Sequence, residues 1–223
     1  MDLPRLYLIT DRKLVPGGDL PGAVEAALRG GARLVQLREK DLTGADLFRL
    51  AESLKRLTDA HRARLLINDR VDVAAATGAS GVHLGERSLS IRDARAILGK
   101  KAVIGYSAHT VEEARMAAGL GADFVTLSPV FPTRKEFSGK LLGLEGLKEA
   151  CGHLSLPVFA LGGINAANAT GALEAGADGL ALVSHVFADP DPAGRTRELL
   201  QAIESARPSE PTRRRWFGPG RKG

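Results

Sequence analysis

Cationic side chains alternate with other residues in the run Gln36-Leu-Arg38-Glu-Lys40. In an extended segment, residues i and i+2 point to the same side, so Gln36, Arg38 and Lys40 are expected to share one face. Two cations on one face suit a phosphate, a diphosphate or a carboxylate. The other interpretation is a solvated run of surface charge.

His109 is the candidate proton carrier, because imidazole titrates near neutral pH. Ser107 precedes it by two residues, so both side chains are expected to face one cavity. A lone histidine is more often structural than catalytic, but this one follows an apolar strand. His83 lies within an apolar run and is expected to pack in the core.

A glycine pair, Gly162-Gly163, precedes a helical stretch. Glycine lets backbone N–H groups approach an anion, and a helix start adds its positive dipole end. Together with Val183 and Ser184, which follow a later strand, this pair predicts a phosphate site. Asp69 could bind a metal, but one carboxylate alone does not make a convincing site.

An internal repeat shows which elements position these residues. Four segments share a Gly-Ala-x start followed by a short apolar strand: Gly31–Leu37, Gly78–Leu84, Gly121–Leu127 and Gly176–Leu182. Four more apolar runs lie between them: Leu6–Thr10, Leu65–Ile67, Val103–Tyr106 and Val158–Ala160. Eight strands are therefore predicted, starting near residues 6, 34, 65, 81, 103, 124, 158 and 179. Helical spacing of apolar residues separates them, as in Leu47–Leu57, Val111–Leu120 and Asp191–Ala206.

The predicted fold is a single α/β domain, a (β/α)8 TIM barrel over residues 1–206. A doubly wound open sheet is the alternative, but it would need fewer units. Active sites of such barrels lie at the carboxyl ends of the strands, and phosphate commonly binds after strands 7 and 8. The candidate residues all fall at or near predicted strand ends.

The charge of the chain is unevenly distributed. The net charge is +5, and residues 207–223 alone account for it, with six basic residues and one acidic residue. This Pro-, Gly- and Arg-rich tail is expected to be disordered and solvated. Trp216 and Phe217 beside the arginines leave a weak RNA or membrane contact as the alternative. No nucleic-acid partner is expected for the barrel itself.

Targeting and redox signals are few. No signal peptide is expected before the first strand, and no apolar run approaches the roughly 18 residues of a membrane span. Cys151 is the sole cysteine, which excludes an internal disulfide. A soluble cytoplasmic protein is therefore expected, without a membrane partner.

The motifs, taken in order, resemble the thiamin phosphate synthase superfamily from about residue 5 to residue 200. The matching segments are Tyr7-x-Ile-Thr-Asp11, Gln36-x-Arg38-x-Lys40, Ile67-Asn-Asp69, Gly81-Val-His-Leu-Gly85, Gly105-x-Ser107-x-His109, Phe131-Pro-Thr133, Gly162-Gly-Ile164 and Gly176-Ala-Asp-Gly179. The resemblance implies a phosphate-binding TIM barrel that acts on a small phosphorylated thiazole. The superfamily has two branches, thiamin phosphate synthase and a TenI-like thiazole tautomerase.

Two departures from the synthase pattern favour the tautomerase branch. In synthases, Mg2+ is held by the Asp of the Asn-Asp pair and by a second Asp, and the second position here is Ser88. Where synthases have Thr-x-Thr-Lys, this chain has Thr133-Arg-Lys-Glu136, and an acid there would repel a diphosphate.

The main expectation is therefore a thiazole tautomerase, an isomerase that converts the thiazole phosphate carboxylate to its aromatic form and needs no cofactor. By resemblance, His109 moves the proton, Arg38 binds the carboxylate, and the backbone of Gly163, Val183 and Ser184 holds the phosphate. The further expected substrate-binding residues are Gln36, Lys40, Asn68, Ser107, Thr133 and Gly162.

Two alternatives remain open. One is the synthase proper, a transferase that joins hydroxymethylpyrimidine diphosphate to thiazole phosphate, with Mg2+ on Asp69; the retained Arg38, Lys40, Asn68 and Asp69 fit this activity. The other is a non-catalytic regulatory barrel, which the polar rim argues against. A homodimer is a possible oligomeric state.

Overall fold

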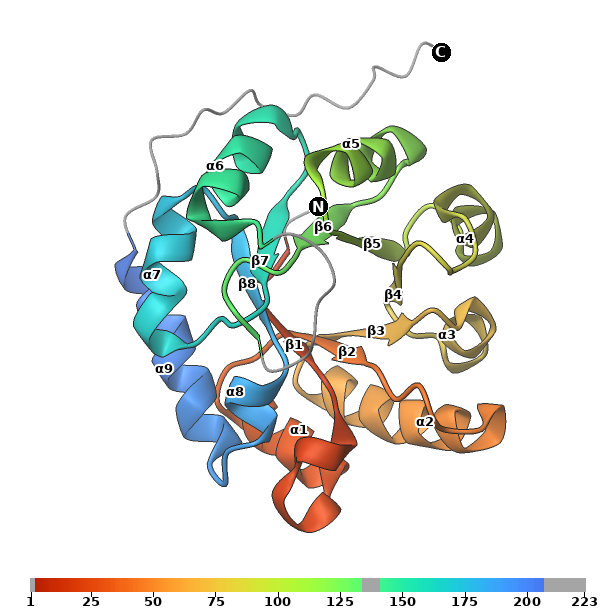
Figure 1. Cartoon of the computed structure of the whole chain (residues 1–223). Coiled ribbons are helices and arrows are strands. Elements are labelled where there is room, and N and C mark those ends of the chain that lie inside the picture. The colour runs from red at the N-terminus through yellow and green to blue at the C-terminus, as the bar shows by residue number, and fades with distance from the viewer. Residues whose placement is uncertain (1–2, 134–140, 207–223) are drawn as a thin grey trace.

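Eight parallel strands close into a barrel in the computed structural model, which describes residues 3–133 and 141–206 (Figure 1). The strands are β1 (Leu6–Ile9), β2 (Leu34–Leu37), β3 (Arg64–Asn68), β4 (Gly81–Leu84), β5 (Val103–Ala108), β6 (Phe124–Leu127), β7 (Val158–Leu161) and β8 (Gly179–Leu182). They are hydrogen-bonded in sequence order, and β1 pairs with β8 through Leu6 and Leu180. This closing pair rules out the open sheet.

Helices surround the barrel, as Figure 1 shows. Their bounds are α1 (Leu20–Arg29), α2 (Gly44–Ala60), α3 (Val71–Thr77), α4 (Ile91–Leu98), α5 (Val111–Leu120), α6 (Gly143–His153), α7 (Ala166–Glu174), α8 (Ser184–Phe187) and α9 (Pro192–Ser205). Two short 3-10 turns, η1 (Arg12–Leu14) and η2 (Pro16–Gly18), precede α1.

The predicted TIM barrel is confirmed, and each strand starts at or within one residue of its predicted position. The short helix α8 was not predicted, because four residues are too few to show helical periodicity. The predicted tail, residues 207–223, lies outside the described residues, so the division of the chain at residue 206 stays a prediction.

Local signals in the sequence account for the helix ends. The side chains of Thr43 and Thr110 accept hydrogen bonds from the backbone N–H groups of Asp46 and Glu113, which caps the starts of α2 and α5. Gly78 and Gly121 end α3 and α5 in the left-handed conformation, with φ of 63° and 94°. These caps turn the chain back into the next strand of the repeat.

The core has two parts. The larger part lies between the strands and the helices. The smaller part fills the barrel interior and consists of Tyr7, Ile9, Leu34, Leu66, Val103, Phe124, Phe159 and Ala181. His83 packs among these rings, 5.6 Å from the ring centres of Tyr7 and Phe124, as predicted. Gly105 makes room for this layer, since a Cβ there would lie 2.4 Å from Phe124 and 2.5 Å from Nδ1 of His83.

Every strand runs in the same direction, so all carboxyl ends open on one mouth, and the aromatic layer fills the barrel beneath it. Among the described residues, no helix combines the length and the apolar character that crossing a bilayer would require.

Candidate active site

The predicted site residues gather at one rim of the barrel. They come from six strand ends: Arg38 and Lys40 after β2, Asn68 and Asp69 at the end of β3, Ser107 and His109 at the end of β5, Thr133 after β6, Gly162 and Gly163 after β7, and Val183 and Ser184 after β8. Since the strands are parallel and the barrel is closed, these ends share one mouth.

Gln36 lies below this rim. It is within β2 and only 1% exposed, and its Nε2 donates a hydrogen bond to the Tyr7 hydroxyl over 2.6 Å. Burial raises the pKa of Tyr7 well above its usual value, so the phenol stays neutral. The Gln36 side chain is therefore hydrogen-bonded to the aromatic layer that lies beneath the mouth.

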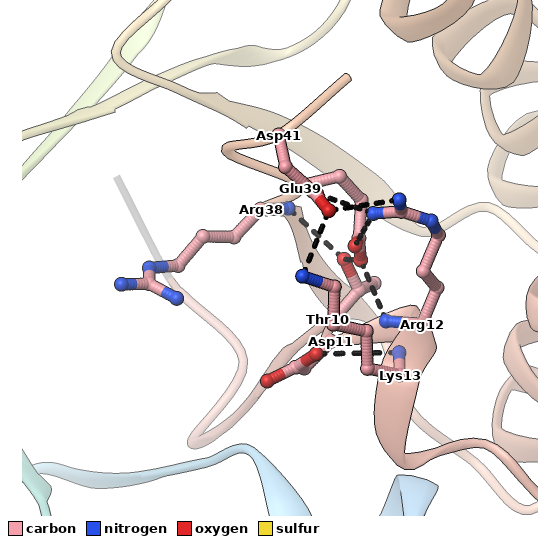
Figure 2. Close-up of polar contacts among 7 residues, drawn as sticks. All are labelled: Thr10, Asp11, Arg12, Lys13, Arg38, Glu39 and Asp41. Atoms are coloured by element: carbon pink, nitrogen blue, oxygen red, sulfur yellow. Dashed lines mark hydrogen bonds and ion pairs between the residues drawn. The ribbon is translucent and has the colours of Figure 1, made fainter. Parts of the chain in front are cut away.

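Arg38 and Lys40 differ in their surroundings. The strand ends at Leu37, and Arg38 is half-buried while Lys40 is exposed in a turn. Figure 2 shows the Arg38 side chain running away from a cluster of ion pairs around Glu39. Exposure therefore increases along the three residues that were expected to share a face: Gln36 is buried, Arg38 is half-buried and Lys40 is exposed.

Asp69 has both carboxylate oxygens hydrogen-bonded. The Asn68 Nδ2 donates to Oδ2 over 2.7 Å, and the Ser88 hydroxyl donates to Oδ1. The backbone of Asp69 adopts a positive φ of 60°, which turns the chain sharply at the end of β3. The residues described in the structure contain no group of three or more His, Cys, Asp or Glu side chains that could hold a metal ion.

His83 connects the interior to the rim. Its Nε2 lies 3.0 Å from the Ser107 hydroxyl and 3.4 Å from that of Thr126. Burial lowers the pKa of His83 to about 3, while the charge of Asp69 raises it and that of Arg38 lowers it. Arg38 and Asp69 follow the ends of the paired parallel strands β2 and β3, so both border the mouth above this ring.

His109 is exposed, and its Nδ1 lies 2.8 Å from the carbonyl oxygen of Ser128. A carbonyl only accepts, so in the neutral ring Nδ1 carries the proton and Nε2 carries the lone pair. His109 also lines a cavity of about 830 Å3 between α5 and α6, together with Leu142 and Glu145. The residue is thus at the rim, on the side that faces these two helices.

The glycine pair is required by close packing. Gly162 and Gly163 have φ of 94° and 66°, and a Cβ on Gly163 would lie 2.5 Å from the Pro132 carbonyl oxygen. The loop after β6 therefore packs directly on the loop after β7. A Cβ on Gly162 would lie 3.4 Å from Thr133, so Thr133 adjoins the glycine pair.

The starts of α7 and α8 differ in their capping. At α7, the Asn165 side chain accepts from the Ala167 N–H, and Asn168 completes a capping box, so its first N–H groups are engaged. Val183 precedes α8 and provides no side-chain cap. The expectation that the helix after Gly163 supplies the dipole stays a prediction, and the short helix α8 begins after the neighbouring strand β8.

A buried polar network was missed by sequence reasoning. Glu39, only 5% exposed, accepts hydrogen bonds from the Thr10 hydroxyl and from the backbone and side chain of Arg12 (Figure 2). Alternation could have shown only that Glu39 points away from Arg38 and Lys40, not that its carboxylate is buried. The partner of Glu39 lies 27 residues away along the chain, which the pattern does not reveal.

Comparisons with known proteins agree with this architecture. A family model described as thiamine monophosphate synthase (TMP-TENI) matches residues 6–186. The chain is 53% identical to a putative thiamine-phosphate synthase of Geobacter sulfurreducens, over 89% of this chain and 93% of that protein. It is 43% identical to the thiamine-phosphate synthase of Clostridium novyi, over 87% and 96% of the two chains. A solved structure, thiamine phosphate pyrophosphorylase from Pyrococcus furiosus, superposes with a TM-score of 0.84 at 38% identity, covering 91% and 96%.

Proposed function

Because the chain belongs to the thiamine monophosphate synthase family, we propose that it is a thiamine-phosphate synthase. It would join hydroxymethylpyrimidine diphosphate to thiazole phosphate and release diphosphate. The observation that carries this proposal is the name shared by relatives that align over nearly the whole chain. Those names favour the transferase over the tautomerase that the sequence favours, and an enzyme over a non-catalytic barrel.

The coupling reaction moves charge onto a leaving group. The thiazole nitrogen forms a bond to the methylene carbon of the pyrimidine, and the bond from that carbon to the diphosphate oxygen breaks. The electron pair leaves with the diphosphate, so cations fixed beside it stabilise the transition state. Arg38, half-buried at the mouth, suits this role as a planar donor to phosphate, and Lys40 adds a second charge from the adjacent turn.

A Mg2+ ion fits the donor set at Asp69. Magnesium is usually held by one or two carboxylates together with substrate phosphates and water, so one carboxylate is sufficient when a diphosphate is bound. Asn68 and Ser88 orient the Asp69 oxygens. A bound Mg2+ would neutralise charge on the diphosphate, while Asp69 holds the ion at the end of β3.

The thiazole phosphate would bind on the opposite side of the mouth. Gly162 and Gly163 after β7, with Val183 and Ser184 after β8, form the loops that bind phosphate in many barrels of this fold. The uncapped start of α8 adds backbone N–H donors. Ser107 and Thr133 would contact the substrates between the two anion sites.

Thiazole tautomerase is the second candidate, and two observations favour it. Ser88 is neutral where the synthase pattern has an acid, and Nε2 of His109 carries a lone pair in the tautomer that its carbonyl partner selects. In this reaction His109 would take a proton from one carbon and return it to another, and Arg38 would bind the substrate carboxylate. No metal is needed.

The two candidates differ in their metal requirement. The deciding experiment supplies the purified protein with both substrate sets in parallel, each with Mg2+ and with a chelator. We expect Mg2+-dependent release of diphosphate and formation of thiamine phosphate. Isomerisation of the thiazole phosphate carboxylate that persists in chelator, without coupling, would replace the synthase with the tautomerase.

A further inference from the structure

The Glu39 carboxylate is buried behind the mouth, between the loop after β1 and the loop after β2. Its side chain is 2% exposed. One oxygen, Oε1, accepts from the Thr10 hydroxyl over 2.8 Å and from the Arg12 N–H over 3.0 Å, and Oε2 accepts from the Arg12 guanidinium over 3.1 Å. A buried charge is strongly unfavourable unless it is paired and hydrogen-bonded, and these three donors satisfy that condition.

Thr10 relays this arrangement to Arg38. The fully buried Thr10 hydroxyl has one proton, which Glu39 accepts, so its lone pairs remain to accept a hydrogen bond. The Arg38 backbone N–H donates to that oxygen over 2.9 Å. The Thr10 N–H in turn donates to the Gln36 carbonyl over 2.9 Å. The two loops are thereby joined just beyond the end of the β1–β2 ladder.

The side chains separate into two groups at this point. In Figure 2, Glu39, Arg12 and Asp41 lie on one side of the strand end, and the Arg38 guanidinium extends to the other. Asp41 pairs with Arg12 and Lys13 in a more exposed outer layer, and these cations hold the pKa of Asp41 well below its usual value. Exposed pairs of this kind contribute little to stability, so the bonds that the buried Glu39 carboxylate accepts from Thr10 and Arg12 are the main links between the two loops.

We propose that Glu39 is a positioning residue that acts through the Thr10 hydroxyl to fix the backbone of Arg38, and so the direction from which its guanidinium meets the diphosphate. The role rests on the proposed function, in which Arg38 binds that anion. Glu39 itself does not contact the substrate. Its effect is to reduce the conformational freedom that Arg38 would lose on binding.

Thr10→Val tests the relay with little change of shape, and Thr10→Ser restores the hydroxyl. The probe is inorganic pyrophosphate, whose Kd is measured by calorimetry on the full-length protein. We expect Thr10→Val to raise this Kd about tenfold, the effect of losing roughly one hydrogen bond, and Thr10→Ser to stay within about twofold of wild type. Glu39→Gln should give an intermediate increase, while Asp41→Asn, which alters only the outer layer, should leave the Kd unchanged.

A double-mutant cycle with Arg38→Ala separates positioning from general damage. If Thr10 acts through Arg38, then Thr10→Val has no further effect on pyrophosphate binding once Arg38 is alanine. Equal effects of Thr10→Val in both backgrounds would overturn the positioning role and leave the proposed function intact. Wild-type affinity in Arg38→Ala itself would remove the anion site from the proposed function, and the positioning role with it.

Hydrogen exchange gives a readout that does not depend on a ligand. The Arg38 amide should be protected in the wild type and in Thr10→Ser, and should exchange faster in Thr10→Val. Unchanged protection of this amide in Thr10→Val would show that the hydroxyl does not fix the Arg38 backbone.

Discussion

The Ser88 hydroxyl donates a hydrogen bond to the Asp69 carboxylate. The same hydroxyl accepts one from the Gly85 N–H over 2.7 Å, so Ser88 fixes the turn after β4 against the end of β3. Asn68 engages the other Asp69 oxygen. A neutral residue thus orients the carboxylate at the place where the resemblance implies a second acidic ligand. The metal site of this chain would therefore depend on one carboxylate and on its neighbours.

This arrangement predicts a graded response to Mg2+. Asp69→Asn should lower kcat/KM for coupling by about 100-fold, because it removes the sole carboxylate ligand of the proposed site. Ser88→Ala should raise the half-saturating Mg2+ concentration about tenfold, the usual scale for loss of a group that orients a ligand. Ser88→Asp should lower that concentration, since it adds a carboxylate. Coupling rates measured across a Mg2+ titration check all three.

The matched control is Asp72→Asn, which changes an exposed carboxylate on α3 that is paired with Arg70. It should leave the Mg2+ requirement unchanged. If Asp69→Asn has the same Mg2+ dependence as the wild type, Asp69 is not a ligand.

Arg38 should contribute mainly to binding of the diphosphate substrate. Arg38→Ala should raise the KM for hydroxymethylpyrimidine diphosphate by about 100-fold, because loss of one partner of a charged hydrogen-bonded pair costs roughly 2–5 kcal/mol. Arg38→Lys keeps the charge but loses the planar fork, so we expect about a tenfold increase. Steady-state kinetics with the thiazole substrate saturating provide the measurement.

Arg29→Ala is the control. It removes an exposed ion pair with Glu25 on α1 and should leave this KM unchanged. A normal KM in Arg38→Ala would assign the diphosphate to other cations.

The sequence predicted the barrel and the rim for physical reasons that can be traced to particular residues. Repeated Gly-Ala-x starts marked β2, β4, β6 and β8, apolar runs marked the other four strands, and all eight strands lie at the predicted positions. The parallel topology then brought Arg38, Asp69 and Gly163 to one mouth without further information. The local sequence pattern was sufficient for these predictions, because each residue is placed by the end of a single strand.

Contacts between different strand ends could not be predicted. The Glu39–Thr10 bond joins residues 29 apart, and the Ser88–Asp69 bond joins residues 19 apart. The Gln36 side chain bonds to Tyr7 and does not face the mouth. This depends on how deep the residue lies in the closed barrel, which the alternation of side chains along a strand does not specify. The cap at Asn165 was visible in the sequence, whereas the short helix α8 left no periodic signal.

His109 should matter little for coupling. Bond formation between the thiazole nitrogen and the methylene carbon transfers no proton, so an acid–base residue is not required at that step. We expect His109→Asn, whose amide can still donate to the Ser128 carbonyl, to reduce the coupling rate by less than about tenfold, well below the 100-fold typical of a lost acid–base group. Single-turnover rates give the measurement. A loss of 100-fold or more would return His109 to the chemical step.

The glycine at position 163 should be costly to replace. Gly163→Ala forces a side chain into a left-handed conformation and places its Cβ 2.5 Å from a backbone oxygen. Gly78→Ala is the matched control, because its φ of 63° is similar and nothing lies within 4 Å of the added Cβ. We expect Gly78→Ala to lower the free energy of unfolding by about 1 kcal/mol and Gly163→Ala by about 1–3 kcal/mol more. Urea denaturation measures the difference. Equal losses would show that the two loops do not pack as closely as described.

His83 should make the stability of the barrel depend on pH below neutrality. Its pKa falls to about 3 in the folded protein because the ring is buried, against 6.5 for an ordinary histidine. Between these values the unfolded chain binds a proton that the folded chain does not, so the free energy of unfolding decreases as the pH falls. The expected contribution is about 1 kcal/mol for each pH unit from 6.5 downwards, and it is fully retained above that pH. His83→Gln should flatten the slope by this amount between about pH 6 and pH 4.5, whatever its effect on absolute stability. Urea denaturation across this range measures the slopes.

Identical slopes in the wild type and in His83→Gln would contradict this prediction. They would mean that the buried ring accepts a proton in the folded barrel, and the apolar interior would then have to contain a partner for its charge.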